Sequence, residues 1–271
     1  MILTRAAVAV ASVVALGAGA VLGHVSGSAA AESAPSAAPQ QIVASSIPTA
    51  KATPSPSADS YPSSTLVPDK VQKGSNGINV VSKITTKNPV FFITIDDGWG
   101  QQKAAADYVA ASHLPVTSFL TNAAVQGNWS FFKKMSAYDA VQNHSMTHKA
   151  LSKDSTDRQY EICGAQSRYA TKIGTKPWIL RPPYGAGFMP RRPSAPAIEK
   201  TAASCGIKHI ALWNVTVDKN GKMAFAGNSF QKGDIVLLHF EGDLAANLKA
   251  LVKAYAKHGL KPASLSQYLA R

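Results

Sequence analysis

Two adjacent carboxylates, Asp96 and Asp97, follow the strongly apolar segment Val90–Ile95 and precede Gly98. Neighbouring acids at the end of a strand repel each other unless a positive group lies between or beside them. A metal cation would resolve that repulsion, with one carboxylate as a ligand and the other free to act as a base. Asp-Gly is also a common turn signal, so the triplet alone favours a turn over a metal site.

A pair of histidines, His144 and His148, is separated by four positions. This spacing would place both imidazoles on one face of a helical turn. Two histidines and one carboxylate leave open positions for water and substrate, as in catalytic sites for divalent metals. Taken alone, the pair is more typical of surface or capping histidines. The adjacent Asn143, Ser145 and Thr147 indicate a hydrogen-bonded loop that leads into a helix.

Two further polar groups also follow apolar segments. The loop Arg181–Gly185 contains two prolines, which fix the backbone, and a glycine, which permits an unusual turn. Such a rigid loop suits the positioning of Arg181 and Tyr184 in a site. His239 follows Ile235–Leu238 and is a candidate general acid. The simpler interpretations are an arginine in a surface ion pair and a partly buried structural histidine.

Predicted strands alternate with predicted helices along the chain, which indicates βα units and a parallel sheet. The predicted strands are Val90–Ile95, Val116–Leu120, Ala140–Gln142, Trp178–Leu180, Lys208–Trp213 and Ile235–Leu238. The predicted helices are Gln102–Ser112, Asp157–Ile173, Ala195–Cys205 and Leu244–His258. The polar motifs follow the strands, and active sites of barrels lie at the carboxyl ends of strands, so a barrel is favoured. No glycine-rich nucleotide-binding motif follows the first strand to support an open doubly wound sheet.

The four motifs occur in a fixed order: Thr94–Gly98, Asn143–His148, Arg181–Gly185 and Leu237–His239. In this order they resemble the signature motifs of the polysaccharide deacetylases, also called the NodB-homology domain or carbohydrate esterase family four. The resemblance covers about residues 85–271. It implies an α/β fold, a distorted (β/α) barrel with about seven strands.

The same resemblance implies a metal-dependent hydrolase that removes acetyl groups from an N-acetylated polysaccharide, either peptidoglycan or a chitin-like glycan. One alternative is an O-acetyl esterase that acts on a xylan-like polysaccharide. Another alternative, from a different class of protein, is a catalytically inactive homologue that binds the cell wall.

The resemblance also implies a role for each motif residue. Asp97, His144 and His148 would bind a divalent metal cation, with zinc expected and cobalt or another divalent ion as alternatives. Asp96 would be the general base that activates water. Arg181 would hold Asp96 in place and tune it.

The remaining roles concern the leaving group and the substrate. His239 would be the general acid, and the backbone N–H of Tyr184 would stabilise the oxyanion. Leu237 would line the pocket for the acetyl methyl group. Trp99, Tyr184 and Trp213 are aromatic candidates for stacking on a sugar, although aromatic side chains mostly serve the core.

The sequence departs from the family pattern in two places. The family has a further motif, an aspartate followed by tryptophan, and Asp218 is the matching residue here, followed by Lys219. By resemblance, Asp218 would support the arginine or the histidine of the other motifs. Phe240 stands after His239, where an aspartate is more usual.

The chain is basic, with 28 Lys and Arg against 15 Asp and Glu and a net charge of +13. A positive field attracts anionic partners, and a cell wall rich in carboxylates and phosphates is a natural candidate. Solubility alone would account for the charge equally well. No nucleic-acid-binding motif accompanies it, so we expect an acetylated polysaccharide and not nucleic acid as the partner.

The N-terminal region predicts export. A positive flank, the uncharged run at residues 6–23 and a small-residue cleavage site predict a signal peptide over residues 1–31. Residues 6–23 approach the length of a membrane span, so an uncleaved anchor is the alternative. The Ala/Ser/Pro-rich residues 32–73 predict a disordered linker, and residues 74–271 the deacetylase catalytic domain. We expect a monomer that is secreted or extracellular, or else anchored to the membrane or cell wall.

The two cysteines, Cys163 and Cys205, are predicted to pair, because an exported chain meets an oxidising compartment. Closing this loop would stabilise the fold by roughly 4 kcal/mol in the chain-entropy picture. Two free buried thiols are the alternative.

Overall fold

The structure is a computed structural model that describes residues 77–189 and 194–271. The predicted signal or anchor segment and the predicted linker lie outside these residues. Within the described part of the chain, no helix is both long and apolar enough to cross a membrane.

In the described part of the chain, ten strands form one sheet. They are β1 (Asn79–Val81), β2 (Val90–Asp97), β3 (Val116–Leu120), β4 (Val141–Asn143), β5 (Ile179–Leu180), β6 (His209–Ala211), β7 (Val215–Val217), β8 (Met223–Phe225), β9 (Ile235–His239) and β10 (Lys261–Pro262). The strand order is β1-β6-β5-β4-β3-β2-β9-β7-β8, with β10 beside β2. All pairs are parallel except β7–β8. Every strand predicted from sequence is present, with ends shifted by up to two residues.

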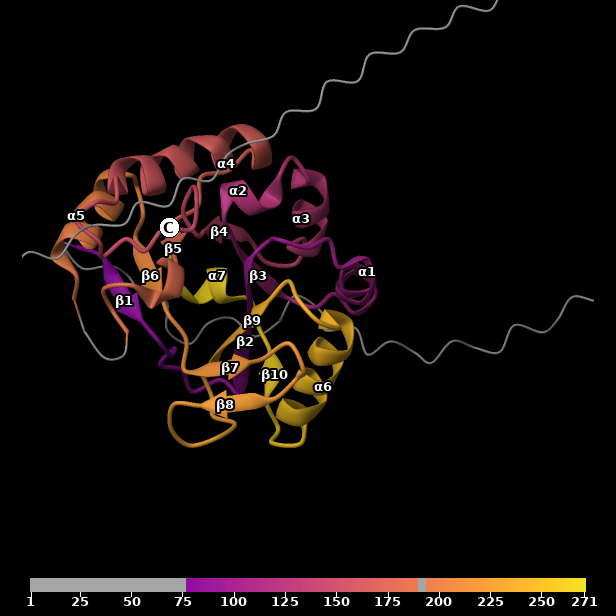
Figure 1. Cartoon of the computed structure of the whole chain (residues 1–271). Coiled ribbons are helices and arrows are strands. Elements are labelled where there is room, and N and C mark those ends of the chain that lie inside the picture. The colour runs from indigo at the N-terminus through magenta and orange to yellow at the C-terminus, as the bar shows by residue number, and fades with distance from the viewer. Residues whose placement is uncertain (1–76, 190–193) are drawn as a thin grey trace, which may run out of the picture. The chain divides into compact units, whose positions relative to one another are not determined.

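Helices accompany this sheet along the chain. They are α1 (Lys103–Ser112), α2 (Asn122–Val125), α3 (Trp129–Met135), α4 (Ala165–Ile173), α5 (Pro196–Ser204), α6 (Leu244–Ala256) and α7 (Leu265–Tyr268), with a π-helix η1 (Gln159–Gly164) and a 3-10 turn η2 (Pro183–Gly185). Figure 1 shows α1, α3, α4, α5 and α6 around the outside of the sheet. Parallel strands with helices outside make a (β/α) barrel, and the short β5 and the antiparallel β8 distort it. The predicted distorted barrel is therefore confirmed.

Strand β2 shows how the sequence orients the two candidate carboxylates. Side chains alternate between the two faces of a strand. Phe91 and Ile93 pack in the outer cluster with residues of α1 and α6, whereas Phe92 packs in the inner cluster beside Tyr268 of α7. Asp96 is four residues after Phe92, so the same alternation directs it towards the barrel interior. The apolar core thus fixes which carboxylate of the pair faces inward.

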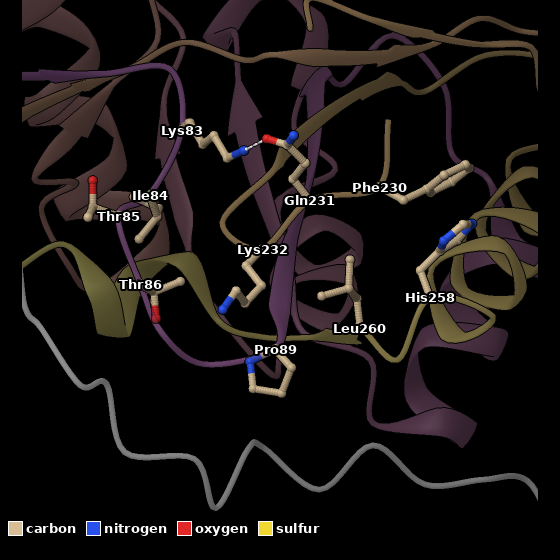
Figure 2. A pocket seen from close by; sticks show the side chains of 10 residues that line it. All are labelled: Lys83, Ile84, Thr85, Thr86, Pro89, Phe230, Gln231, Lys232, His258 and Leu260. Carbon is tan, nitrogen blue, oxygen red and sulfur yellow. Dashed lines mark hydrogen bonds between the residues drawn. The ribbon is translucent and has the colours of Figure 1, made fainter. Parts of the chain in front are cut away.

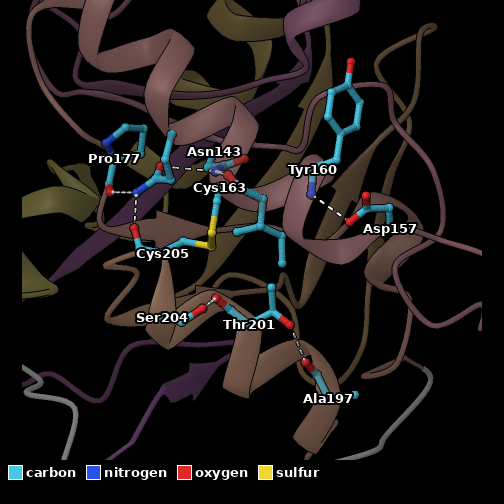
Figure 3. The surroundings of a disulfide bond; sticks show 11 residues. Asn143, Asp157, Tyr160, Cys163, Pro177, Ala197, Thr201, Ser204 and Cys205 are labelled. Atoms are coloured by element: carbon cyan, nitrogen blue, oxygen red, sulfur yellow. Dashed lines mark hydrogen bonds between the residues drawn. A yellow bond between two sulfur atoms is a disulfide. The ribbon is translucent and has the colours of Figure 1, made fainter.

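The predicted helix Asp157–Ile173 is divided into η1 and α4. Cys163 in η1 forms a disulfide with Cys205, which follows α5 directly, with Cα atoms 5.0 Å apart (Figure 3). The structure thus contains the pairing predicted from sequence. The bond joins η1 to the end of α5, and the two cysteines are 42 residues apart in the chain.

A cavity of about 710 Å³ lies at the amino ends of β2 and β9 (Figure 2). Its lining includes Lys83, Lys232 and His258, and Lys83 lies 3.5 Å from the buried carboxylate of Asp234. None of the predicted catalytic residues lines this cavity, because they follow the opposite, carboxyl ends of the same strands. Cavity size is therefore a poor guide to the site here.

Candidate active site and metal centre

Asp97, His144 and His148 come together at the carboxyl ends of the strands. Asp97 ends β2 and His144 follows β4, and these two strands flank β3. The Oδ1 atom of Asp97 lies 3.3 Å from Nε2 of His144 and 3.0 Å from Nε2 of His148. One potential ligand atom from each residue lies within 4.8 Å of the others. Side chains from two segments that are distant in sequence thus present one clustered ligand set.

The hydrogen bonds around this cluster fit a cation. Nδ1 of His144 lies 2.7 Å from the backbone carbonyl of Arg181, which can only accept, so Nδ1 carries the proton. In the neutral imidazole, Nε2 therefore directs a lone pair towards Asp97. Oδ1 of Asp97 is buried and has no hydrogen-bond partner of good geometry among the described residues. Two facing acceptors are stabilised by a cation between them, as in Asp-His-His sites for divalent metals.

The charge of Asp97 supports the same interpretation. Burial by itself would raise the pKa of Asp97, but the imidazoles of His144 and His148, where they are protonated and donate to the carboxylate, lower it below its ordinary value. The carboxylate is therefore ionised at neutral pH and available as a ligand.

The loop after β4 differs from the predicted helical turn. Residues 144–148 are not helical, and both Ser145 and His148 have positive φ angles, 76° and 62°. Asp97 and Tyr184 share this left-handed region, with φ angles of 78° and 61°. Such conformations are strained for residues other than glycine and cluster at functional sites. The two histidines lie close together, but through a loop with left-handed residues and not through the predicted helical turn.

Asp96 is held by the buried guanidinium of Arg181. Nη1 of Arg181 donates to Oδ1 of Asp96 at 2.7 Å and to the hydroxyl of Thr94 at 2.8 Å. Its Nε and Nη2 donate to the carbonyls of Ala211 and Leu212 at 2.9 and 3.0 Å. Burial lowers the pKa of Arg181, but guanidinium remains charged in proteins. Thr94 was not singled out from the sequence as a partner, although it lies within the first motif.

Oδ2 of Asp96 faces the cluster of Asp97, His144 and His148, because it lies 3.6 Å from Nε2 of His144. One oxygen of this carboxylate is thus fixed by Arg181 and the other is directed at the ligands. This arrangement suits a base that takes a proton from a water beside the cation.

A small cavity of about 250 Å³ adjoins the cluster and is lined by Asp97, Trp99, His239, Phe240 and Glu241. His239 pairs in register with Asp96 across β2 and β9, so the predicted base and acid lie on neighbouring strands. The side chain of His239 is 39% exposed, which leaves it open to a substrate. Oε1 of Glu241 lies 4.0 Å from its Nδ1. Sequence reasoning missed Glu241, whose only signal was an acid two positions after the strand-end histidine.

The aromatic candidates differ in their exposure. Trp99 and Tyr184 are 58% and 67% exposed, and the hydroxyl of Tyr184 lies 3.1 Å from Nδ1 of His148. Trp213 is half-buried, and the centroid of its ring lies 5.7 Å from Cζ of Arg181. Leu237 is buried on β9. Trp99 and Tyr184 are therefore the aromatic residues at the site that can meet a sugar.

Among the described residues, Asp218 forms no hydrogen bond or ion pair with Arg181 or His239, although β7 pairs in parallel with β9. It follows β7 at an exposed turn, and its Oδ1 accepts hydrogen bonds from the N–H groups of Asn220 and Lys222, both at 2.9 Å. The turn between β7 and β8 therefore uses this carboxylate. Thr94 and two backbone carbonyls provide the support for Arg181 that was expected from Asp218.

Comparison with known proteins gives the family. The polysaccharide deacetylase family matches residues 83–209. An uncharacterised protein of Streptomyces coelicolor is 30% identical over 198 residues, covering 70% of this chain and 77% of that protein. The chain belongs to the polysaccharide deacetylase family, with its NodB-homology fold, and members of this family are hydrolases.

Solved structures agree in fold. A peptidoglycan N-acetylglucosamine deacetylase is similar with a TM-score of 0.58 and 19% identity, covering 70% of this chain and 92% of that chain. A family 4 carbohydrate esterase from Streptomyces lividans, in complex with acetate, is similar with a TM-score of 0.55 and 21% identity. The match covers 66% of this chain and 94% of that chain. A pseudoenzyme of carbohydrate esterase family four from Bacillus anthracis is similar with a TM-score of 0.57 and 19% identity. The match covers 70% of this chain and 69% of that chain. One fold therefore serves both active and inactive relatives, so activity must be argued from the side chains.

Proposed function

We propose that this protein is a metal-dependent deacetylase that removes N-acetyl groups from a polysaccharide, with peptidoglycan as the glycan. The observation that carries the proposal is the convergence of Asp97, His144 and His148 beside Asp96, which Arg181 fixes at 2.7 Å. A divalent cation held by the three ligands, zinc by expectation, supplies Lewis acidity towards water and the acetyl carbonyl.

The protein residues supply the proton transfers. Asp96 accepts a proton from the attacking water at Oδ2, because Arg181 occupies Oδ1. The water oxygen bonds to the acetyl carbon, and the N–H of Tyr184 stabilises the charge on the carbonyl oxygen. The carbon–nitrogen bond then breaks, and protonated His239 gives its proton to the leaving nitrogen. The products are acetate and an amine on the sugar.

The surroundings of the site favour a polymeric substrate. Trp99 lies on the side of His239, and Tyr184 lies against His148, with ring centroids 4.6 Å apart. Exposed aromatic faces on two sides of the ligand cluster can stack on successive sugars. The net charge of +13 favours an anionic glycan such as peptidoglycan over neutral chitin. An exported protein held at the membrane or cell wall would meet this substrate.

The first test measures acetate release by the purified protein from N-acetylated peptidoglycan, chitin oligomers and acetylxylan, with zinc or cobalt and with a chelator. We expect release from peptidoglycan that the chelator abolishes. Release from acetylxylan alone would establish the O-acetyl esterase instead. No release from any glycan by the metal-loaded protein would favour the inactive wall-binding homologue.

Two variants test the assigned residues. Asp96→Asn should keep the metal and lower turnover by about 10²–10⁴-fold, the usual contribution of a general base. His144→Ala should lose the metal, measured by elemental analysis after dialysis. Asp154→Asn, at a fully exposed carboxylate, is the control and should change neither property. Undiminished turnover in Asp96→Asn would contradict the assignment of Asp96 as the general base.

A further inference from the structure

Glu161 is a buried carboxylate outside every motif of the sequence. It lies on η1 and is 1% exposed. Its Oε2 accepts hydrogen bonds from the N–H groups of Met146 and Thr147 at 3.1 and 2.8 Å. Its Oε1 accepts another from the hydroxyl of Thr147. All three donors belong to the loop that joins the two histidine ligands.

That loop needs partners because its backbone is strained. Ser145 and His148 are both left-handed, and such conformations persist only where the surroundings fix them. The carbonyls of Ser145 and Met146 accept hydrogen bonds from the N–H groups of Asn122 and Ala123, at 3.2 and 3.0 Å. Glu161 binds the N–H groups on the other side. The loop is therefore held through both its acceptors and its donors.

The helix that carries Glu161 is itself anchored. Cys163, two residues later, is bonded to Cys205 (Figure 3). The side-chain amide of Asn143 donates to the carbonyl of Ile162 at 3.1 Å, while its Oδ1 accepts from the N–H of Ser145 at 2.7 Å. Asn143 immediately precedes the first histidine. The helix and the ligand loop are thus joined through Asn143 as well as through Glu161.

We propose that Glu161 is a positioning residue for the metal site, which it preorganises by fixing the loop between His144 and His148. The inference rests on the proposed function only in taking Asp97, His144 and His148 as metal ligands. Partners of this kind orient ligands, and their removal typically lowers metal affinity by about 10–100-fold. The disulfide keeps the helix in place so that the carboxylate meets the loop.

The test measures zinc affinity of the full metal-free protein by competition with a chromophoric chelator, with folding followed by circular dichroism. Glu161→Ala should remain folded and bind zinc about 10–100-fold more weakly, and Glu161→Gln, which keeps one acceptor, should lie between. Glu199→Ala is the matched control, because Glu199 also accepts a backbone N–H and a hydroxyl, from Ala195 and Ser194, away from the ligand loop. It should bind zinc as the parent does.

Thr147→Val is a milder variant in case Glu161→Ala does not fold. It removes one donor to Glu161 and should weaken zinc binding by a few fold, whereas Thr201→Val, at a hydroxyl bonded to the carbonyl of Ala197, should not. Unchanged zinc affinity in folded Glu161→Ala, or in Thr147→Val, would overturn the proposal. The readout is independent of acetate release, so a failure of the proposed function would be seen separately in the parent protein.

Discussion

Replacing Arg181 by methionine tests whether a buried ion pair holds the site together. Methionine keeps much of the volume but removes every donor of the guanidinium. Asp96, 2% exposed, would then keep a buried charge without its cation, and the carbonyls of Ala211 and Leu212 would lose their partners. Removing one partner of a buried ion pair costs about 3–5 kcal/mol. In a domain of this size, each 1 kcal/mol lowers Tm by roughly 2–4 °C, so we expect a drop of about 6–20 °C.

The assay is denaturant and thermal unfolding of the metal-free protein. Arg158→Met is the control, since Arg158 is partly exposed and its Nε donates to the carbonyl of Leu151 at 2.7 Å. It should cost about 0.5–1.5 kcal/mol. The double variant Asp96→Asn with Arg181→Met should be less destabilised than the sum of its single variants, because the uncompensated charge is gone. A loss below about 1 kcal/mol in Arg181→Met would refute the view that this pair stabilises the fold.

Three further predictions follow from exposure, charge and covalent structure. Trp99→Ala should leave stability within about 0.5 kcal/mol of the parent, because the side chain is exposed, but should raise KM for the polymeric glycan by about 2–10-fold; an unchanged KM in steady-state assays would contradict the stacking role. Burial and the carboxylate of Asp234 raise the pKa of Tyr255 above its ordinary value. The stability that neutral Tyr255 contributes is therefore present below about pH 10, the pKa of tyrosine in the unfolded chain, and is lost as pH rises above that value. Tyr255→Phe should therefore flatten the loss of stability above pH 10 in unfolding titrations, and an equal slope in both proteins would count against it. Replacing Cys163 and Cys205 by serine should cost about 4 kcal/mol in the same unfolding assay, and no loss would exclude the loop-entropy account.

The sequence was informative where motifs and strand periodicity agree. The carboxyl ends of parallel strands share one edge of a sheet, so polar residues after β2, β4, β5 and β9 had to meet there. The strand ends therefore predict the neighbourhood of Asp97, His144, Arg181 and His239. It also predicted the barrel, since β-branched and aromatic segments alternate with helical ones.

The rest depends on contacts that a linear pattern does not contain. Asp218 matched a motif by type, but the turn after β7 directs it to backbone N–H groups, and turn geometry was not readable from spacing. Glu161 carried no signal, because a glutamate in a helical segment usually faces solvent. Short strands such as β1 and β10 were missed because pairing with a neighbour, and not local composition, makes them strands.

Arg181 serves the site through two chemically different parts, since its carbonyl accepts from His144 while its side chain holds Asp96. Every amino acid at position 181 would supply a carbonyl, but only arginine supplies that guanidinium. The backbone contact to His144 is thus protected against coding changes at this position, whereas the side-chain contact to Asp96 is not. Under the proposed function, one codon change at position 181 would remove the support of Asp96 and leave Asp97, His144 and His148 unchanged. Retention of the three ligands would then not by itself show that Asp96 is still supported.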